Sequence, residues 1–474
     1  MEMAASDPLP RSTPAAQGVA AEGISALIDA LAARDLQVHS CMILRHGFVI
    51  AEGWWQPYAA DVPHMLFSLS KSFTSTAVGL AVHEGRLSVD DIVTSFFPDD
   101  LPESIGPNLA AMRVRHLLTM GTGHHTDTTG RARDAGNGDW ARGFLALEVE
   151  HAPGSPFVYN SGATYMLSAI VQRVTGLTLL DYLTPRLFQP LGIEGATWES
   201  SPQGINAGGW GLSLKTEDIA RFGQLYLQKG RWHGQQVVPE TWVEAATSRQ
   251  IENGSGGASD WAQGYGYQFW RCRHRAYRGD GAYGQYCIVM PEHDAVIAMT
   301  GGTGNLQGVL DCVWDHVLPA MGGGDAAQDA ALRERLGRLT LAPGRRGVAP
   351  QAGAPAAHRP YRLEPNPASL ESITLDFTGS VCRATLVEAG VTRDIECGFD
   401  AWRMGEAVRA AGQGPDPCAG LASWEEDGSL MLDWHFVRTP FGRTLRMRAD
   451  TDGVEVHYRA NVGEHSRGLT IRGA

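Results

Sequence analysis

Lysine is the scarcest charged residue of this 474-residue chain. Of the 39 basic residues, only Lys71, Lys215 and Lys229 are lysines, and the others are arginines. Because lysines are so few, each one is a candidate for a specific role, and its surroundings in the sequence are informative. Lys71 lies at the start of a long apolar stretch, and unpaired lysines are seldom buried.

Cysteine pairs and export or membrane segments are also missing. The seven cysteines are scattered and show no Cys-x-x-Cys spacing. The first residues lack a basic segment followed by an apolar run, and no stretch of about 20 apolar residues occurs. These absences predict a reduced, cytoplasmic protein with free thiols and without a membrane partner.

The formal net charge of −13 argues against a nucleic-acid partner, because phosphate binding needs clustered Lys and Arg. Gly-x-Ser-x-Gly, His-Glu-x-x-His, Walker-type and Rossmann motifs are absent as well. A conventional α/β-hydrolase and a zinc peptidase are therefore disfavoured. His124-His125 has no second pair at ligand spacing, so we expect no metal and no cofactor.

The first two thirds of the chain predict an α/β domain over residues 1–321. Residues 18–34 show an amphipathic helical pattern, and 41–44 with 48–51 form a hairpin pattern. A buried helix follows Ser68 and ends near Gly85. Helical patterns then continue from about 89 to 229, and strands return at 282–290 and 295–300. This order fits a sheet with a helical insertion.

The composition changes after Met321. Residues 322–360 are rich in Gly, Ala, Pro and Arg and predict a linker with one short helix at 326–339. From residue 361 to 474 the patterns are almost all strand, with hairpin signals such as Asp427-Gly428. We expect a small antiparallel β domain there that could form a barrel.

The first chemical signal is Ser68-Leu69-Ser70-Lys71. Three residues apart on a helix, Ser68 and Lys71 share one face. A serine hydroxyl needs a nearby base to act as a nucleophile, and a lysine can serve once burial lowers its pKa. The helix start would also direct N–H groups at an attacked carbonyl. Chance occurrence of this spacing is the alternative.

The second signal is Tyr159-Asn160-Ser161, ahead of an apolar helix. Tyr159 could act as a phenolic base if a nearby lysine lowered its pKa. Alternatively, Asn160 or Ser161 caps the helix and Tyr159 packs beside it, which does not exclude catalysis.

The third signal is Gly279-Asp280-Gly281-Ala282-Tyr283 at a strand entrance. Glycines there allow a ligand to approach the backbone closely. A plain turn or bulge is the alternative.

Together these motifs resemble the serine β-lactamase and penicillin-binding-protein superfamily, whose Ser-x-x-Lys pattern is well known. The resemblance is closest to class C β-lactamases, related esterases and 6-aminohexanoate-dimer hydrolases, and spans about residues 11–321. Supporting segments are Val114-Arg115-His116-Leu117-Leu118-Thr119-Met120, residues 159–176, and Gly209-Trp210-Gly211-Leu212-Ser213. It implies an antiparallel sheet flanked by helices, with a helical subdomain.

The resemblance also implies roles for individual residues. Ser68 would be the acylated nucleophile, Lys71 would accept its proton, and Tyr159 would be general base and leaving-group acid. Ser161 stands where many relatives have asparagine. The backbone N–H groups of Ser68 and Ala282, with Gly281 beside them, would form the oxyanion hole.

One triplet departs from the family pattern. Class C enzymes carry Lys-Thr-Gly or His-x-Gly before the last core strand, whereas here Gly279-Asp280-Gly281 occupies that place without a cation. Since that cation usually holds a substrate carboxylate, an ester or neutral amide is favoured. Trp210, His124, Asp280 and Tyr283 are candidates for the substrate pocket.

We therefore expect a serine hydrolase acting on a small-molecule or short-peptide acyl substrate. Two alternatives stay open. One is an acyltransferase or peptide cyclase of the penicillin-binding type, and the other is a sensor of β-lactams or peptides that stays acylated. A homodimer is compatible with the sequence.

Overall fold

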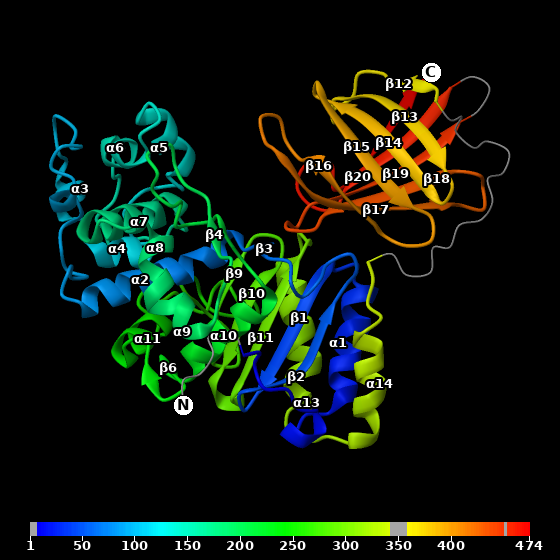
Figure 1. Cartoon of the computed structure of the whole chain (residues 1–474). Helices are drawn as coiled ribbons and strands as arrows, with labels where there is room; N and C mark the ends of the chain where they lie inside the picture. Colours follow the sequence, from blue (N-terminus) through cyan, green and yellow to red (C-terminus); the bar gives the residue numbers. More distant parts are fainter. Residues whose placement is uncertain (1–6, 342–357, 450–452) are drawn as a thin grey trace.

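The computed structural model describes residues 7–341, 358–449 and 453–474. Its centre is a six-stranded antiparallel sheet with the order β2-β1-β11-β10-β9-β8 (Figure 1). The N-terminal hairpin therefore pairs with strands from near residue 300, as β1 aligns Ile43 with Ile297. The strands are β1 (Val38–Arg45), β2 (Phe48–Trp54), β8 (Trp270–Arg271), β9 (Tyr277–Gly281), β10 (Gln285–Met290) and β11 (Ala295–Gly301).

Both faces of this sheet are buried, and alternate residues serve different cores. On β1, Cys41 and Ile43 pack with α1, α12 and α14, whereas Met42 and Leu44 join the core that contains α2 and α10. The helices are α1 (Ala21–Ala33), α12 (Leu306–Cys312), α13 (Leu318–Ala320) and α14 (Ala326–Leu336) on the first face, and α2 (Ser70–His83) and α10 (Thr216–Leu227) on the second. The helix and hairpin predictions for residues 18–83 are confirmed.

A helical region follows α2 and occupies the upper left of Figure 1. Its longest helix, α7 (Ser161–Thr175), packs against α2. The other helices in and beside this region are α3 (Pro107–Ala111), α4 (Val114–Leu118), α5 (Thr129–Ala135), α6 (Trp140–Ala146), α8 (Leu179–Leu183), α9 (Gln189–Leu191) and α11 (Glu240–Thr247). The predicted helical insertion is thus present.

A small sheet holds the segment that leads into α2. Its strands are β3 (His64–Met65), β5 (Leu212–Leu214) and β4 (Thr197–Trp198), in the order β3-β5-β4. The next residue, Leu66, donates its N–H to the carbonyl of Leu212 at 2.9 Å. The chain therefore enters α2 from a fixed position. A separate two-stranded ribbon joins β6 (Arg231–Trp232) and β7 (Gln235–Gln236).

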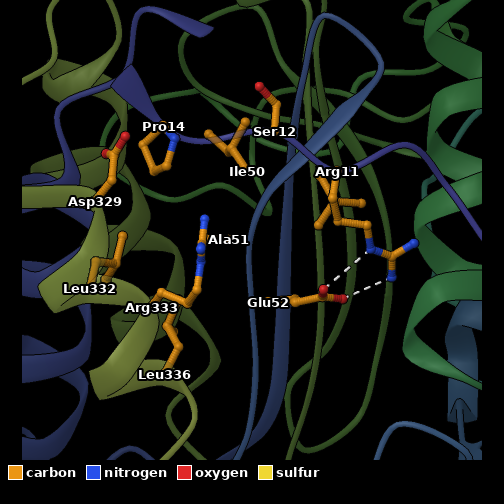
Figure 2. Close-up of a pocket in the computed structure, with 11 residues that line it drawn as sticks. Arg11, Ser12, Pro14, Ile50, Ala51, Glu52, Asp329, Leu332, Arg333 and Leu336 are labelled. Carbon is orange, nitrogen blue, oxygen red and sulfur yellow. Dashed lines mark hydrogen bonds and ion pairs between the residues drawn. The ribbon is translucent and has the colours of Figure 1, made fainter. Parts of the chain in front are cut away.

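The N-terminal segment and α14 flank the edge strand β2. Arg11 pairs with Glu52 of β2 at 2.9 Å and lines a surface pocket whose other wall includes Asp329 and Leu332 of α14 (Figure 2). The helix predicted at 326–339 is therefore α14, and it packs on α1 and β2. Residues 342–357 of the predicted linker lie outside the described residues, and the proposed domain division at residues 321 and 360 stays a prediction.

The C-terminal sheet domain is antiparallel except for one short parallel pairing between β15 and β17. Reciprocal 2.9 Å backbone hydrogen bonds between Arg362 and Ala474 join its two ends, so the sheet curls into a near-barrel. Its strands are β12 (Pro360–Arg362), β13 (Leu370–Thr378), β14 (Val381–Glu388), β15 (Val391–Gly398), β16 (Arg403–Val408), β17 (Pro415–Trp424), β18 (Leu430–Phe436), β19 (Gly442–Ala449), β20 (Val454–Ala460) and β21 (Leu469–Gly473).

None of the helices within the described ranges combines the length and apolar character needed to cross a membrane. The seven cysteines are buried and unbonded to one another. The cellular compartment stays a prediction.

Candidate active site

Ser68 lies in a single 3-10 turn, Phe67–Leu69, that runs directly into α2. The preceding residue, Phe67, has φ of 49°, a left-handed conformation that is unusual outside glycine. Such conformations persist only where the surroundings enforce them, and they gather at functional sites. Ser68 itself is partly exposed, whereas Leu69 and Ser70 after it are buried.

Lys71 lies one turn beyond Ser68, as the spacing predicts, and points back at it. Its Nζ donates to Ser68 Oγ at 2.9 Å, to Ser161 Oγ at 3.0 Å and to the carbonyl of Gly209 at 2.8 Å. All three partners are uncharged. The structure therefore brings two of the predicted site residues, Ser68 and Ser161, within hydrogen-bond distance of Lys71.

Burial lowers the pKa of Lys71 from its usual value to about 7, although Asp127 and Asp280 nearby oppose the shift. A buried amine without a directly bonded carboxylate loses solvation when it is charged, and so gives up its proton more easily. At neutral pH a large share of Lys71 is therefore the free base. That is the state required to take a proton from Ser68.

Tyr159 lies on the other side of the same amine. Its ring centroid is 4.8 Å from Lys71 Nζ, and the ring stacks on Trp270 at 5.3 Å. Burial and the negative charge of Asp280 raise the pKa of Tyr159, and a hydrogen bond with Ser68 only partly offsets them. The expectation that a lysine would lower this pKa is therefore wrong. Lys71, itself partly uncharged near neutral pH, does not outweigh these two effects.

Asn160 caps α7, as one of the alternatives held, because its Oδ1 accepts the N–H of Ala163 at 3.3 Å. This cap directs Ser161 towards Lys71. Asp127 reinforces the arrangement by accepting the N–H of Ser161 at 2.6 Å. Capping and the catalytic geometry thus coexist in one turn.

The two glycines of Gly279-Asp280-Gly281 let strand β9 approach the serine segment closely. A Cβ on Gly281 would lie 2.0 Å from the carbonyl oxygen of Leu66, and one on Gly279 would lie 2.5 Å from both Leu69 and Ser72. The sequence pattern predicts that a ligand can approach the backbone here. The structure shows that the room is taken by the backbone and side chains next to Ser68, so β9 lies directly against the segment that carries this serine.

Asp280 is not an open substrate contact. It is only 7% exposed and forms an ion pair with the fully buried Arg278 on the same strand, at 2.9 Å. Trp270 adds a hydrogen bond, while burial raises the pKa of Asp280. The triplet itself carries no cation, as the sequence shows, but Arg278 directly before it is paired with Asp280.

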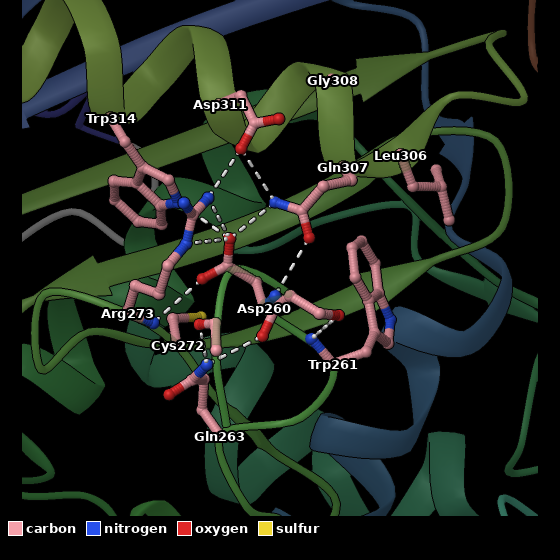
Figure 3. A network of polar contacts seen from close by, with 12 residues as sticks. Asp260, Trp261, Gln263, Cys272, Arg273, Leu306, Gln307, Gly308, Asp311 and Trp314 are labelled. Atoms are coloured by element: carbon pink, nitrogen blue, oxygen red, sulfur yellow. Dashed lines mark hydrogen bonds and ion pairs between the residues drawn. The ribbon is translucent and has the colours of Figure 1, made fainter. Parts of the chain in front are cut away.

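The loop before β8 holds Arg278 through the backbone of Asp260, and the buried carboxylate of Asp260 is the centre of a network of polar contacts (Figure 3). The carbonyl of Asp260 accepts from Arg278 Nη1 at 2.8 Å. The carboxylate of Asp260 accepts from Arg273, Gln307 and Trp314 at 2.8, 2.7 and 3.0 Å. This network anchors the loop before β8 to α12 and so fixes the position of the ion pair between Arg278 and Asp280.

The remaining predicted pocket residues divide into two groups. Trp210 and Tyr283 are partly exposed and adjoin Gly209 and Ala282 in sequence. His124 is fully buried, packs on Phe144 and has Nδ1 3.0 Å from Thr122 Oγ1. A substrate cannot reach it, so the prediction of His124 as a pocket residue is wrong.

Sequence reasoning missed three contributors to the site. Gly209 supplies a carbonyl to Lys71, Asp127 holds Ser161, and Arg278 neutralises Asp280. Only Arg278 had a local signal, since alternate residues of a strand share a face with Asp280. No group of three or more His, Cys, Asp or Glu suited to a metal occurs in the part of the chain that the structure describes.

Comparisons with known proteins identify the family of the chain. The family model named Beta-lactamase matches residues 24–305, which is more than half of the chain. A 6-aminohexanoate-dimer hydrolase of Paenarthrobacter ureafaciens is 30% identical over 299 residues, covering 57% of this chain and 76% of the relative. The chain belongs to the β-lactamase family, and it is a serine hydrolase.

Two solved structures extend the similarity in fold. The octameric penicillin-binding protein homologue from Pyrococcus abyssi aligns with a TM-score of 0.51 and 17% identity, over 95% of this chain and 99% of its own. EstCE1, described as a hydrolase with promiscuous acyltransferase activity, aligns with a TM-score of 0.51 and 17% identity, over 62% and 99%. The predicted fold class is confirmed, including the C-terminal sheet domain.

Proposed function

We propose that this hydrolase cleaves an ester or neutral amide through an acyl-enzyme on Ser68. The supporting observation is the 2.9 Å contact between Lys71 Nζ and Ser68 Oγ, in surroundings that lower the lysine pKa to about 7. A neutral amine at hydrogen-bond distance is a competent base for a serine nucleophile.

The proposed reaction has two steps. Ser68 Oγ attacks the carbonyl carbon while its proton passes to Lys71, and the backbone N–H groups of Ser68 and Ala282 stabilise the oxyanion. The raised pKa of Tyr159 makes this residue a phenol that gives its proton to the leaving group and regains one from Lys71. Water then attacks the ester formed on Ser68, with the same groups moving protons in reverse.

The expected substrate is uncharged near the scissile bond. The cation on β9, Arg278, is fully buried and paired with Asp280, so a substrate carboxylate would find no free partner there. Asp127 and Asp280 would also repel it. This favours an ester or a linear amide over a penicillin or a peptide with a free C-terminal carboxylate.

A substrate panel tests the proposal. p-Nitrophenyl esters, short linear amides, D-amino-acid amides and nitrocefin are compared between the wild type and Ser68→Ala. We expect ester or amide turnover that Ser68→Ala reduces at least 1000-fold, as for other nucleophile removals. Undiminished turnover by Ser68→Ala would exclude the proposal.

Acyl transfer remains the second candidate, because the fold neighbour EstCE1 is described as having acyltransferase activity. Adding an amine or an alcohol to the assay separates the two. A hydrolase gives mainly free acid, whereas a transferase gives mainly the new amide or ester.

A further inference from the structure

The C-terminal sheet domain reaches the segment that carries Ser68. Between β18 and β19, the loop of residues 437–441 places the carbonyl of Arg438 2.8 Å from the N–H of Met65, three residues before Ser68. The hydroxyl of Tyr58 donates to the carbonyl of Thr439 at 3.0 Å, and Asn461 donates to that of Pro440 at 2.7 Å. The loop is therefore fixed at three points, two of them from the first domain.

The last residue of this loop, Phe441, contacts two residues that flank the proposed reaction centre. The centroid of its ring lies 6.2 Å from the ring centroid of Phe67 and 5.8 Å from that of Tyr283. The ring centroids of Phe67 and Tyr283 are 5.3 Å apart. Phe67 precedes Ser68, and Tyr283 follows Ala282. One aromatic ring thus comes from each of three distant parts of the chain.

All three rings are partly exposed, although neighbouring core residues such as Leu66 and Leu69 are buried. Contiguous apolar surface left open on a protein usually marks a binding site. Phe67 and Tyr283 lie next to Ser68 and Ala282 in the chain, and this position indicates which part of a substrate the three rings contact. The acyl group bound to Ser68 is the part of a substrate that stays beside both.

We propose that Phe67, Tyr283 and Phe441 form a three-ring surface that binds an apolar acyl group, and that the C-terminal sheet domain thereby takes part in substrate selection. This rests on the proposed function of Ser68. It narrows the substrate class to esters or amides whose acyl part carries an alkyl chain or an aromatic ring, because such groups gain most from burial against aromatic side chains.

The test compares p-nitrophenyl acetate with p-nitrophenyl octanoate on Phe441→Ala. We expect the ratio of kcat/KM for octanoate to that for acetate to fall roughly 10-fold, the size expected for losing contact with one ring. Phe399→Ala is the matched control, since Phe399 lies in another aromatic cluster of the same sheet domain, with Phe377 and Trp424. Its ratio should stay at the wild-type value.

The ratio of the two kcat/KM values distinguishes two roles of Phe441. A ring that binds the acyl group affects octanoate more than acetate, whereas a ring that only holds the Phe67 turn in place affects both esters equally. Equal losses for both esters, or an unchanged ratio in a folded Phe441→Ala protein, would overturn the inference. Should Phe441→Ala fail to fold, Phe441→Leu is measured in its place, with a smaller fall in the ratio expected and an unchanged ratio overturning the inference. Failure of the proposed function is distinct: Ser68→Ala would then hydrolyse both esters as fast as the wild type.

Discussion

At the scale of single residues, the proposed reaction depends on an amine whose surroundings make it a base. Lys71 is buried, and its three hydrogen-bond acceptors are two hydroxyls and one carbonyl. The spacing Ser68-x-x-Lys71 predicted the contact between the two side chains, because one helical turn fixes it. The acceptors Ser161 and Gly209 come from 90 and 138 residues away, which no local pattern reveals.

The pH dependence of the reaction follows from the lysine. With a pKa of about 7, Lys71 is protonated below that pH and free above it, so kcat/KM should rise from pH 5 to pH 8 with a midpoint near 7. Initial rates in buffers of constant ionic strength measure it.

Lys71→Arg serves as the control for this profile, since a guanidinium keeps its proton throughout the range. It should be nearly inactive at every pH tested. A wild-type profile that is flat or falling between pH 5 and pH 8 would remove Lys71 as the base.

At the scale of secondary-structure elements, the close packing of β9 against the turn that carries Ser68 determines the geometry of the proposed site. The Gly-Asp-Gly pattern was visible in the sequence, but its partner was not, because Leu66 lies more than 200 residues earlier in the chain. Tyr159 gives a second example. The family resemblance implied a place beside Lys71, whereas the direction of its pKa shift depends on burial and on Asp280, which only the folded chain brings about.

Gly281→Ala tests the close approach. Its Cβ would overlap the carbonyl oxygen of Leu66, so β9 or the serine turn must shift, and overpacking of this kind costs about 1–3 kcal/mol. We expect thermal unfolding at lower temperature together with a loss of most esterase activity.

Gly304→Ala is the matched control, since a Cβ there meets nothing within 4 Å. It should unfold and react like the wild type. Full activity in Gly281→Ala would show that Ala282 need not be held where the structure has it.

The buried ion pair on β9 gives a stability prediction. Arg278→Met leaves the carboxylate of Asp280 buried without its partner, and breaking such a pair costs about 3–5 kcal/mol. Urea unfolding should show this loss, and adding Asp280→Asn to the same protein should recover most of it.

Arg275→Met is the corresponding control, because Arg275 is 81% exposed in its pair with Glu292. Exposed pairs contribute about 0–1 kcal/mol. Equal destabilisation by both arginine substitutions would contradict the account of the buried pair.

At the scale of the whole molecule, the contact between the two domains is built around buried histidines. His39 Nδ1 lies 3.1 Å from His64 Nε2. The ring of Tyr58 stacks on His39, and its hydroxyl oxygen lies 3.5 Å from His435 Nδ1. Composition and strand patterns predicted a β domain after residue 361. They could not predict how this domain docks on the first one, since each of these residues looks ordinary in its own segment of the sequence.

This histidine contact makes the molecule sensitive to acid. Burial lowers the pKa of His64 to about 4 and that of His435 to about 3, and Arg443 adds to the shift of His435. In the unfolded chain both would titrate near 6.5. As the pH falls from about 6.5 towards 4, the unfolded state takes up protons that the folded state cannot, so the free energy of unfolding decreases.

His435→Gln removes one of these groups and should weaken the pH dependence of Tm between pH 7 and pH 5. His457→Gln, at an exposed position of the same sheet domain, is the control and should keep the wild-type dependence. Calorimetry at several pH values measures both. An unaltered pH dependence in His435→Gln would show that this histidine is not kept neutral by the domain contact.

The central claim is that Ser68 becomes acylated. It is tested most directly by quenching the enzyme in acid within seconds of adding p-nitrophenyl octanoate and mapping the added mass by peptide mass spectrometry. The account predicts one octanoyl group, on the peptide containing Ser68, that disappears on longer incubation and is absent from Ser68→Ala. The same measurement is made on Tyr159→Phe, which lacks the proposed proton donor. An acyl group on a residue other than Ser68 during turnover would contradict the proposed reaction. Turnover without an acyl group on either the wild type or Tyr159→Phe would contradict it as well.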